Sequence, residues 1–407
     1  MNDEVNPGDS LLLRNARIVS IDRVIDNAGL LIEEGRITHI SDSNSLTTAD
    51  RNSVLDLSGL TLWPGFIDVH IHGAAGIDTM QARAEDLAHV SEFLARQGVT
   101  GWLPTVVPSA RAQYETAISA ITEAMREQQA EKKQPGRLRS QVLGVHYEGP
   151  FVSADQCGAL HREHFRSFNN LTDLDTLPSV DFQGAIHMMT LAPEIEGGIE
   201  LIRQLNTHGW VISIGHTRAD IDMLDQALAA GAHHMTHFMN AMTPLHHRAP
   251  GPIGWGLTED EVTCDLIADG VHLDPMILRL VVRCKTPERL SLISDAIAAA
   301  GLGNGEYQIW GETISVTSGR TRNSHGSIAG SVITMLDAVR LMRRLGLPEP
   351  DVARMASLNP ARLLGIDDEC GSIAEGKWAD LVALDHDGNV RLVMVRGRIA
   401  VSNCEAA

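Results

Sequence analysis

The chain has 407 residues, of which 43% are hydrophobic and 21% are charged, so it is long enough for a large core and one or two domains. Its formal net charge of −19 argues against a nucleic-acid or anionic-membrane partner, because such binding needs clustered Lys and Arg. No apolar run approaches the ~18 residues of a membrane span, and the first residues do not resemble a signal peptide. Five cysteines without a CxxC pair favour a reducing cytoplasm over a disulfide framework.

The two ends of the chain show strand patterns. Residues 11–60 consist of short alternating segments separated by polar turns. The last stretch is similar, with ADLVALD and VRLVMVRGRIAV joined by the turn DHDGN. We therefore predict a small β-sandwich domain built from both termini, residues 1–62 and 366–407.

Between these ends, residues 63–365 alternate between short apolar strands and helical segments. We expect strands at 63–72, 99–106, 142–149, 185–192, 210–216, 233–238, 262–268 and 290–295. Eight strand-then-helix units in about 300 residues predict a (β/α)8 barrel. An open, doubly wound sheet is the alternative, and it is disfavoured because the sequence contains no glycine-rich nucleotide loop.

Two helices of this region have clear sequence signals. Residues 83–98 carry apolar side chains at helical spacing. In 217–231, Thr217 and Asp220 have the spacing of a capping box, and Gly231 is a plausible C-terminal stop. The polar stretch 129–140 is expected to be a surface connection.

Polar side chains stand at the ends of five predicted strands, where active sites of such barrels lie. These residues are His70 and His72, Glu148, His216, His237 and Asp295. His70 and His72 are two residues apart, so both imidazoles face the barrel mouth while Ile71 points outward. Imidazole and carboxylate ligands together suit Zn²⁺, Mn²⁺, Fe²⁺ or Co²⁺.

Each candidate also has a purely structural alternative. His216 would accept a hydrogen bond beside a helix start, and His237 would be one of several satisfied histidines in HHMTH. Asp295 would cap the segment that follows it. A buried carboxylate is costly unless it is paired or metal-bound, and all six residues fall at strand ends, so we favour a metal site.

The ordered motifs resemble the N-acetylglucosamine-6-phosphate deacetylases of the amidohydrolase superfamily. The matching stretches are PGFIDVHIHG (64–73), HYEGPF (146–151), GHT (215–217), HFMNAM (237–242), IADGVH (267–272), SDA (294–296) and IAGS (328–331), with the closing GSIAEGKWADLVALD. The resemblance spans nearly the whole chain. It implies an enzyme that hydrolyses the acetamide of N-acetyl-D-glucosamine 6-phosphate to D-glucosamine 6-phosphate and acetate in amino sugar catabolism.

The resemblance also implies roles for the candidate ligands. Glu148, His216 and His237 match the ligands of the main metal, for which zinc is the first expectation and Fe²⁺, Mn²⁺ or Co²⁺ are alternatives. His70 and His72 match a second site that some family members lose, so one or two ions are expected per chain, with Glu148 and Asp295 shared in a two-metal centre. Many superfamily relatives bridge two metals with a carbamylated lysine. None of the four lysines (Lys132, Lys133, Lys285 and Lys377) lies at a predicted strand end, so Glu148 is expected to bridge.

Asp295 is expected to be the catalytic acid and base, taking a proton from the attacking water and returning one to the leaving amine. Further positions match substrate-contacting residues of the family: Ala159, Leu160, His161, Asn240, Ala241, Arg248, His272, Ile328, Ala329 and Gly330. The resemblance implies that Arg248 reaches the phosphate bound by the neighbouring subunit of a homodimer. A guanidinium suits this role because it binds phosphate in a bidentate manner. A solvated loop arginine is the alternative, and His246 and His247 beside it stay unassigned.

One position departs from the family pattern. The family usually carries a histidine directly after the Gly-Ala that follows EGPF, and here Leu160 takes that place, with His161 next. Three explanations are open: the loop has gained a residue and His161 serves, the metal alone polarises the carbonyl, or the substrate is shifted.

The substrate also has alternatives, namely the N-acetylgalactosamine epimer or another N-acyl amine. A non-catalytic barrel predicts broken ligand positions, whereas all six are intact here.

Overall fold

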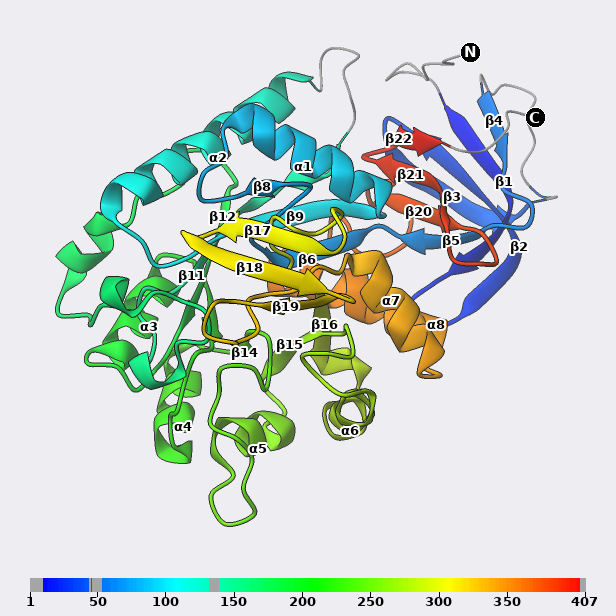
Figure 1. Ribbon diagram of the computed structural model, residues 1–407. Coiled ribbons are helices and arrows are strands. Elements are labelled where there is room, and N and C mark those ends of the chain that lie inside the picture. The colour runs from blue at the N-terminus through cyan, green and yellow to red at the C-terminus, as the bar shows by residue number, and fades with distance from the viewer. Residues whose placement is uncertain (1–9, 44, 46–52, 132–138, 403–407) are drawn as a thin grey trace.

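A computed structural model describes residues 10–43, 45, 53–131 and 139–402. Eight parallel strands form a barrel in the middle of the chain (Figure 1). They are β6 (Phe66–Ile71), β9 (Val99–Val106), β11 (Gly144–Glu148), β12 (Ile186–Leu191), β13 (Val211–Ile214), β14 (His234–Met235), β15 (Thr263–Ile267) and β16 (Leu290–Ile293). The last strand meets the first where the Asp295 amide donates to the His70 carbonyl at 3.0 Å. The predicted (β/α)8 barrel is confirmed.

Helices cover the outside of the barrel (Figure 1). They are α1 (Ala84–Arg96), α2 (Arg111–Glu131), α3 (Gly198–Thr207), α4 (Ile221–Ala230), α5 (Gly251–Thr258), α6 (Pro275–Lys285), α7 (Met335–Arg344), α8 (Glu349–Ala353) and α9 (Asn359–Leu363). The segment after β11 contains short 3-10 helices between residues 154 and 176. Among the helices of the described residues, none has both the length and the apolar character that crossing a bilayer requires.

Two local predictions need correction. The strand predicted at 233–238 is only two residues long, because His237 and Met239 adopt left-handed backbone conformations that end the extended segment. The predicted capping box is wrong: α4 begins at Ile221, and Asp220 is the N-cap, accepting from the Met223 amide at 2.9 Å. Thr217 donates instead to Glu194 at 2.6 Å.

The other two helix predictions are confirmed. Gly231 ends α4 at φ +117°, as predicted, and α1 lies within the predicted helix. The polar stretch predicted as a surface connection falls largely outside the described residues, since α2 continues to Glu131 and residues 132–138 are not described.

Strands from both ends of the chain form a second sheet beside the barrel, blue and red in Figure 1. Its strands are β1 (Leu11–Val19), β2 (Val24–Glu33), β3 (Arg36–Asp42), β4 (Ser53–Asp56), β5 (Thr61–Pro64), β20 (Leu381–Leu384), β21 (Val390–Val395) and β22 (Arg398–Ser402). Antiparallel pairing of β5 with β20 joins the two termini. The apolar side chains of β3 and β21, such as Ile37 and Leu392, share one core, so the sheet curls around it. The predicted β domain from both termini is confirmed, while its boundaries stay a prediction.

A small sheet that the sequence did not predict follows β16. It consists of β17 (Gly305–Ile309), β18 (Glu312–Thr317) and β19 (Arg320–Arg322), shown in yellow in front of the barrel strands in Figure 1. Its apolar face, including Ile309 and Ile314, packs on Ile297 just after the end of β16. A second short pairing, β7 (Gly73–Ala74) with β8 (Ile77–Asp78), follows the end of β6. Both additions therefore lie next to the strand ends that carry the predicted ligands.

Candidate metal centre

The six predicted ligands are all buried and converge at the C-terminal ends of the barrel strands. Glu148 Oε1 lies 2.8 Å from His216 Nε2 and 3.0 Å from His237 Nε2, and these two nitrogens are 3.1 Å apart. Three electron-pair donors from three different strands thus face a common point.

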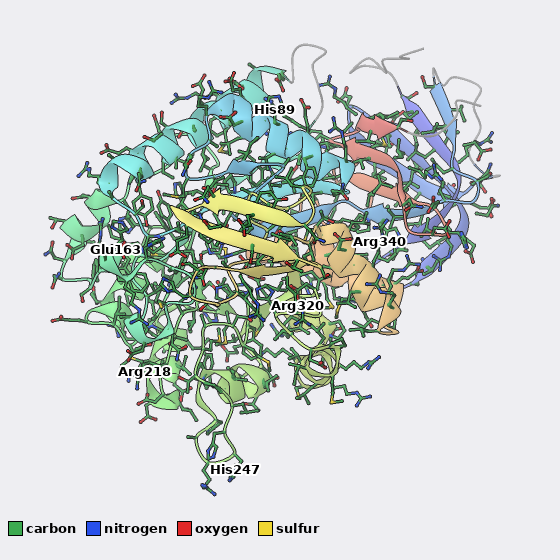
Figure 2. The ribbon with its side chains drawn as sticks, viewed as in Figure 1. His89, Glu163, Arg218, His247, Arg320 and Arg340 are labelled. Carbon is green, nitrogen blue, oxygen red and sulfur yellow. The ribbon has the colours of Figure 1, made fainter. Side chains whose placement is uncertain are left out.

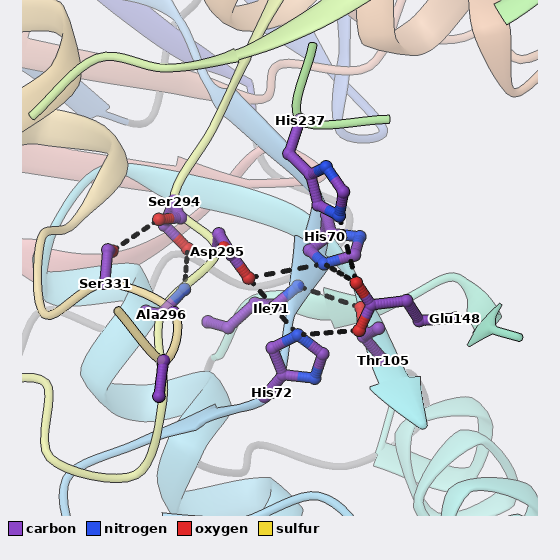
Figure 3. A network of polar contacts seen from close by, with 12 residues as sticks. His70, Ile71, His72, Thr105, Glu148, His237, Ser294, Asp295, Ala296 and Ser331 are labelled. Carbon is purple, nitrogen blue, oxygen red and sulfur yellow. Dashed lines mark hydrogen bonds and ion pairs between the residues drawn. The ribbon is translucent and has the colours of Figure 1, made fainter. Parts of the chain in front are cut away.

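The remaining ligands surround a second, adjoining point (Figure 3). Asp295 Oδ1 lies 3.3 Å from His70 Nε2 and 3.2 Å from His72 Nε2. The Glu148 carboxylate also reaches this side, with Oε2 at 3.4 Å from His72 Nε2 and Oε1 at 3.8 Å from His70 Nε2. Glu148 therefore contacts histidines of both groups, as a bridging ligand would.

The hydrogen bond of His216 to the backbone orients its imidazole as a metal ligand would be oriented. Its Nδ1 lies 2.8 Å from the Gln156 carbonyl oxygen, which can only accept, so Nδ1 carries a proton. In the neutral form, the imidazole therefore directs its Nε2 lone pair toward Glu148 Oε1, 2.8 Å away, as a metal ligand would; without a metal, the same contact needs a proton on Nε2. Imidazole nitrogen and carboxylate oxygen are the donor set of Zn²⁺ and related divalent ions.

The described lysines do not join this centre. Lys285 donates to the Glu259 carbonyl, and Lys377 donates to Ser372 at 2.7 Å. Lys132 and Lys133 lie outside the described residues. No lysine of the described residues therefore takes the place of Glu148 as a bridging ligand.

Backbone strain accompanies three of the ligands. His216, His237 and Asp295 each follow a barrel strand and have φ values of 47°, 33° and 49°. Left-handed conformations of non-glycine residues cost about 1–3 kcal/mol each and persist where the surroundings enforce them. Their occurrence at three strand ends in one cluster is typical of a functional site.

The electrostatics of the site favour ionised carboxylates. Burial would raise the pKa of Glu148, but hydrogen bonds with His216 and His237 and the charge of His70 hold this pKa well below its usual value. Burial opposes the ionisation of Asp295 in the same way, and the contacts with His70 and His72 again lower the pKa. Both groups are thus ionised, and so available as metal ligands, at neutral pH.

Sequence reasoning missed the polar residues beneath the ligands. His146 Nδ1 lies 3.3 Å from His70 Nδ1, and its Nε2 lies 2.8 Å from Thr190 Oγ1, which contacts Thr236 at 2.6 Å. Asp68 accepts from Ser294 Oγ at 2.6 Å and so holds the segment before Asp295. Burial raises the pKa of Asp68 to about 7 despite the hydrogen bonds from Ser294. The sequence does contain a signal for two of these residues. His146 and Asp68 each stand two residues before a predicted ligand and therefore share its face of the strand.

Several predicted substrate residues lie against the centre. Gly330 packs on Asp295: a Cβ there would lie 2.9 Å from the Asp295 carbonyl oxygen. Asn240 donates to the His237 carbonyl at 3.1 Å, and the carbonyl of Ala241 accepts from the Thr217 amide at 3.1 Å. These three positions are therefore adjacent to metal ligands.

The other predicted substrate residues are more varied. Ala159 packs against the three-stranded sheet, Leu160 is buried in the main core, and Ala329 is fully buried. His161 is half-buried and lies 3.4 Å from Glu163, while His272 Nδ1 lies 2.7 Å from Asp269. Ile328 is exposed, as is Arg248 in the protruding loop whose tip carries His247 (Figure 2). The role of each in substrate binding stays a prediction.

Comparison with known proteins identifies the family. Residues 61–400 match the Amidohydrolase family. An N-acetylglucosamine-6-phosphate deacetylase of Bacillus subtilis (strain 168) is 37% identical over 98% of this chain and 99% of its own length. The chain belongs to the N-acetylglucosamine-6-phosphate deacetylase family. This membership confirms the predicted resemblance and enzyme class, a hydrolase acting on amide C–N bonds, and it implies a divalent metal.

Two further members of this deacetylase group bear on the substrate. An N-acetylgalactosamine-6-phosphate deacetylase of Escherichia coli O157:H7 is 36% identical over 96% of this chain and 99% of its own length. The solved structure of a mutant N-acetyl-D-glucosamine-6-phosphate deacetylase of Mycobacterium smegmatis, in complex with N-acetyl-D-glucosamine-6-phosphate, has a TM-score of 0.85 and 31% identity. The match covers 97% of this chain and all of that chain.

Proposed function

We propose that this chain hydrolyses the acetamide of N-acetyl-D-glucosamine 6-phosphate to D-glucosamine 6-phosphate and acetate. The observation that carries the proposal is the intact centre around Glu148, whose carboxylate contacts histidines of both groups, in a chain that matches a member of this family over 99% of that member's length. The cysteines among the described residues are free, which suits a reducing cytoplasm as the place of action.

The metal chemistry would be supplied by one or two divalent ions, with zinc our first assignment. Glu148, His216 and His237 would hold the first ion, and His70, His72 and Asp295 would complete a second position. A divalent metal, when bound, lowers the pKa of a water molecule to about 7 and polarises a carbonyl oxygen.

Asp295 moves the proton in this scheme. Its Oδ1 faces His70 and His72, and its pKa is held low because these contacts outweigh the effect of burial. We assign the second carboxylate oxygen to take the proton of the attacking water and to pass it to the leaving nitrogen.

Phosphate recognition is assigned to Arg248 of a second copy of this chain. The guanidinium is exposed on the loop 243–250, which projects from the barrel beside α5 (Figure 2). A projecting arginine that serves the neighbouring subunit requires a homodimer, which we include in the proposal.

The Leu160 position is explained best by a metal-polarised carbonyl. Leu160 is 8% exposed and packs in the main core, and His161 is paired with Glu163 instead of a metal ligand. We therefore propose that no histidine of this loop contacts the acetyl oxygen, and that its polarisation would come from a divalent ion held by Glu148, His216 and His237.

N-Acetylgalactosamine 6-phosphate is the second candidate substrate, because a deacetylase named for it is 36% identical to this chain. The two candidates differ at one sugar hydroxyl.

A substrate panel tests the proposal. Acetate release would be measured with the 6-phosphates of N-acetylglucosamine and N-acetylgalactosamine, the unphosphorylated sugars and a few N-acetyl amino acids, with the Asp295→Asn protein as the control for contaminating activity. We expect kcat/KM for a phosphorylated sugar to exceed that for its unphosphorylated form by at least about 100-fold. Activity confined to unphosphorylated compounds would contradict the role of Arg248, and no acetate from either phosphate would refute the proposed function.

A further inference from the structure

Three buried polar atoms around His72 are left without hydrogen-bond partners among the described residues. They are His72 Nδ1, Asp78 Oδ2 and Trp310 Nε1. Asp78 is near enough to His72 to help raise the pKa of that imidazole, and Trp310 is near enough to Asp78 to lower the pKa of its carboxyl. One potential acceptor thus lies near two potential donors, although no hydrogen bond joins them in this structure.

Local strand pairing fixes Asp78 beside His72. In the β7–β8 pair, Gly73 lies opposite Asp78, and the Thr79 amide donates to the His72 carbonyl at 2.9 Å. Gly73 is required for this close approach, because a Cβ there would lie 2.0 Å from the Ile77 carbonyl oxygen. The Met80 amide donates to Asp78 Oδ1 at 2.7 Å. This hydrogen bond engages one carboxylate oxygen and leaves Oδ2 as a potential acceptor for His72.

Trp310 is held over His72 by the turn between β17 and β18. The pairing of Ile309 with Glu312 leaves a two-residue turn, in which Trp310 and Gly311 have φ values of 54° and 77°. Such turns favour Asn or Gly, since both central residues need positive φ, so a tryptophan at the first position is strained. Its ring stands edge-on to the His72 imidazole, with centroids 5.2 Å apart and an interplanar angle of 86°. Strained residues concentrate at functional sites, so the strain of Trp310 beside the predicted metal ligand His72 indicates a functional contact.

We propose that Asp78 and Trp310 are positioning residues for His72. In the metal-bound protein, Asp78 Oδ2 would accept the Nδ1 proton of His72, the Trp310 indole N–H would donate to the same carboxylate, and the imidazole would present Nε2 to the second metal position. A metal-binding histidine commonly donates its other N–H to a carboxylate in this way. The group that includes His216 uses a different partner, the Gln156 carbonyl, so the effect should be confined to one side of the centre. This inference rests on the proposed function, of which it specifies the second metal position.

The test measures binding of Zn²⁺ at each position. Metal-free protein would be equilibrated with Zn²⁺ in chelator buffers, and bound zinc per chain would be measured for wild type, Asp78→Ala, Asp78→Asn, Trp310→Phe and His72→Ala. Trp255→Phe is the matched control, because its indole also donates to an aspartate, Asp225, at 2.8 Å, but on the outer helices α4 and α5. Thermal unfolding of the metal-free proteins would report any general loss of stability.

We expect wild type to bind two ions. Asp78→Ala should weaken one of them by roughly 10–100-fold and leave the other unchanged. Asp78→Asn should restore part of the affinity, because the amide oxygen still accepts the Nδ1 proton, and Trp310→Phe should weaken the same ion less. Adding Asp78→Ala to His72→Ala should have no further effect, since Asp78 acts through His72.

Several results would overturn the inference. They are equal weakening of both ions, unchanged binding in Asp78→Ala, and further weakening when Asp78→Ala is added to His72→Ala. Binding of a single ion by wild type would also overturn it, while leaving a one-metal deacetylase intact. Failure to release acetate from either sugar phosphate would refute the proposed function without changing the zinc counts, so the two failures are distinguishable.

Discussion

The two groups of ligands in the metal centre are built differently. Glu148, His216 and His237 lie between 2.8 and 3.1 Å from one another, and a backbone carbonyl, that of Gln156, orients His216. In the second group, Asp295 Oδ1 lies 3.3 Å from His70 Nε2 and 3.2 Å from His72 Nε2. Side chains from neighbouring segments surround this second group, among them His146 beneath His70 and Trp310 over His72.

This difference has a physical consequence. A ligand oriented by the backbone keeps its position when single side chains change, whereas one oriented by other side chains can be altered by one substitution. The first group should therefore bind its ion more tightly and more robustly. The second group is also the one that, by the family resemblance, some members lose.

The largest effect should come from Glu148→Ala, which removes the ligand shared by both groups. We expect the protein to lose both ions and turnover to fall by at least about 10⁴-fold. Metal analysis and acetate release measure this, with Glu163→Ala as the control for loss of an exposed carboxylate. A Glu148→Ala protein that still binds two ions would show that Glu148 does not bridge.

Asp295→Asn should separate chemistry from binding. The ion held by Glu148, His216 and His237 should stay bound, while kcat should fall by about 10²–10⁴-fold because the proton acceptor is lost. Single-turnover acetate release, together with zinc content, measures both effects. Turnover close to that of wild type would refute the acid/base assignment.

Arg248→Ala should leave the metal centre unchanged and raise KM for the sugar phosphate by about 10–100-fold. His247→Ala, on the same exposed loop, is the control. Mixing the Arg248→Ala and Asp295→Asn proteins should restore activity, because a mixed dimer contains one site with both Asp295 and the partner's arginine. The absence of restoration in a verified mixed dimer would place Arg248 in its own subunit's site.

Metal binding should release protons. Burial would lower the pKa of His72 and of His237, but Asp295 beside His72 and Glu148 beside His237 raise both above the usual value. Imidazoles with raised pKa keep their protons to higher pH, so metal affinity should increase as pH rises through these values and weaken as pH falls. Calorimetry in buffers of different ionisation enthalpy should show net proton release near pH 7, and equal heats in all buffers would contradict it.

The smallest effect on the centre should come from the terminal β-sheet. Leu392 is fully buried in the core of that sheet, and Leu392→Ala should lower the free energy of unfolding by about 2–5 kcal/mol. Zinc content and kcat of the folded protein should not change. A selective loss of metal would mean that the sheet supports the barrel mouth.

The ligands could be predicted from sequence because each lies at or just after the end of an apolar strand, and parallel strands end at one edge of a barrel. The length of β14 could not, because the left-handed backbone at His237 is set by the tertiary contacts of the site. Thr217 is a good capping residue, yet its hydroxyl is engaged by Glu194, which comes from a different strand end.

The three-stranded sheet was missed for a related reason. Its first turn is Trp310-Gly311, whereas Asn-Gly is the signal for a two-residue hairpin. Trp310 occupies that turn against local preference, beside His72, which lies more than 200 residues earlier in the chain. A sequence pattern that covers only a few neighbouring residues cannot reveal a contact between residues so far apart in the chain.

The most direct test is to remove all metal with a chelator, return Zn²⁺ in steps, and follow acetate release from N-acetyl-D-glucosamine 6-phosphate against bound ions per chain. We expect no turnover in the metal-free protein and activity that rises with occupancy of the centre around Glu148. Turnover that persists without metal, or a fully loaded protein that releases no acetate, would contradict the account.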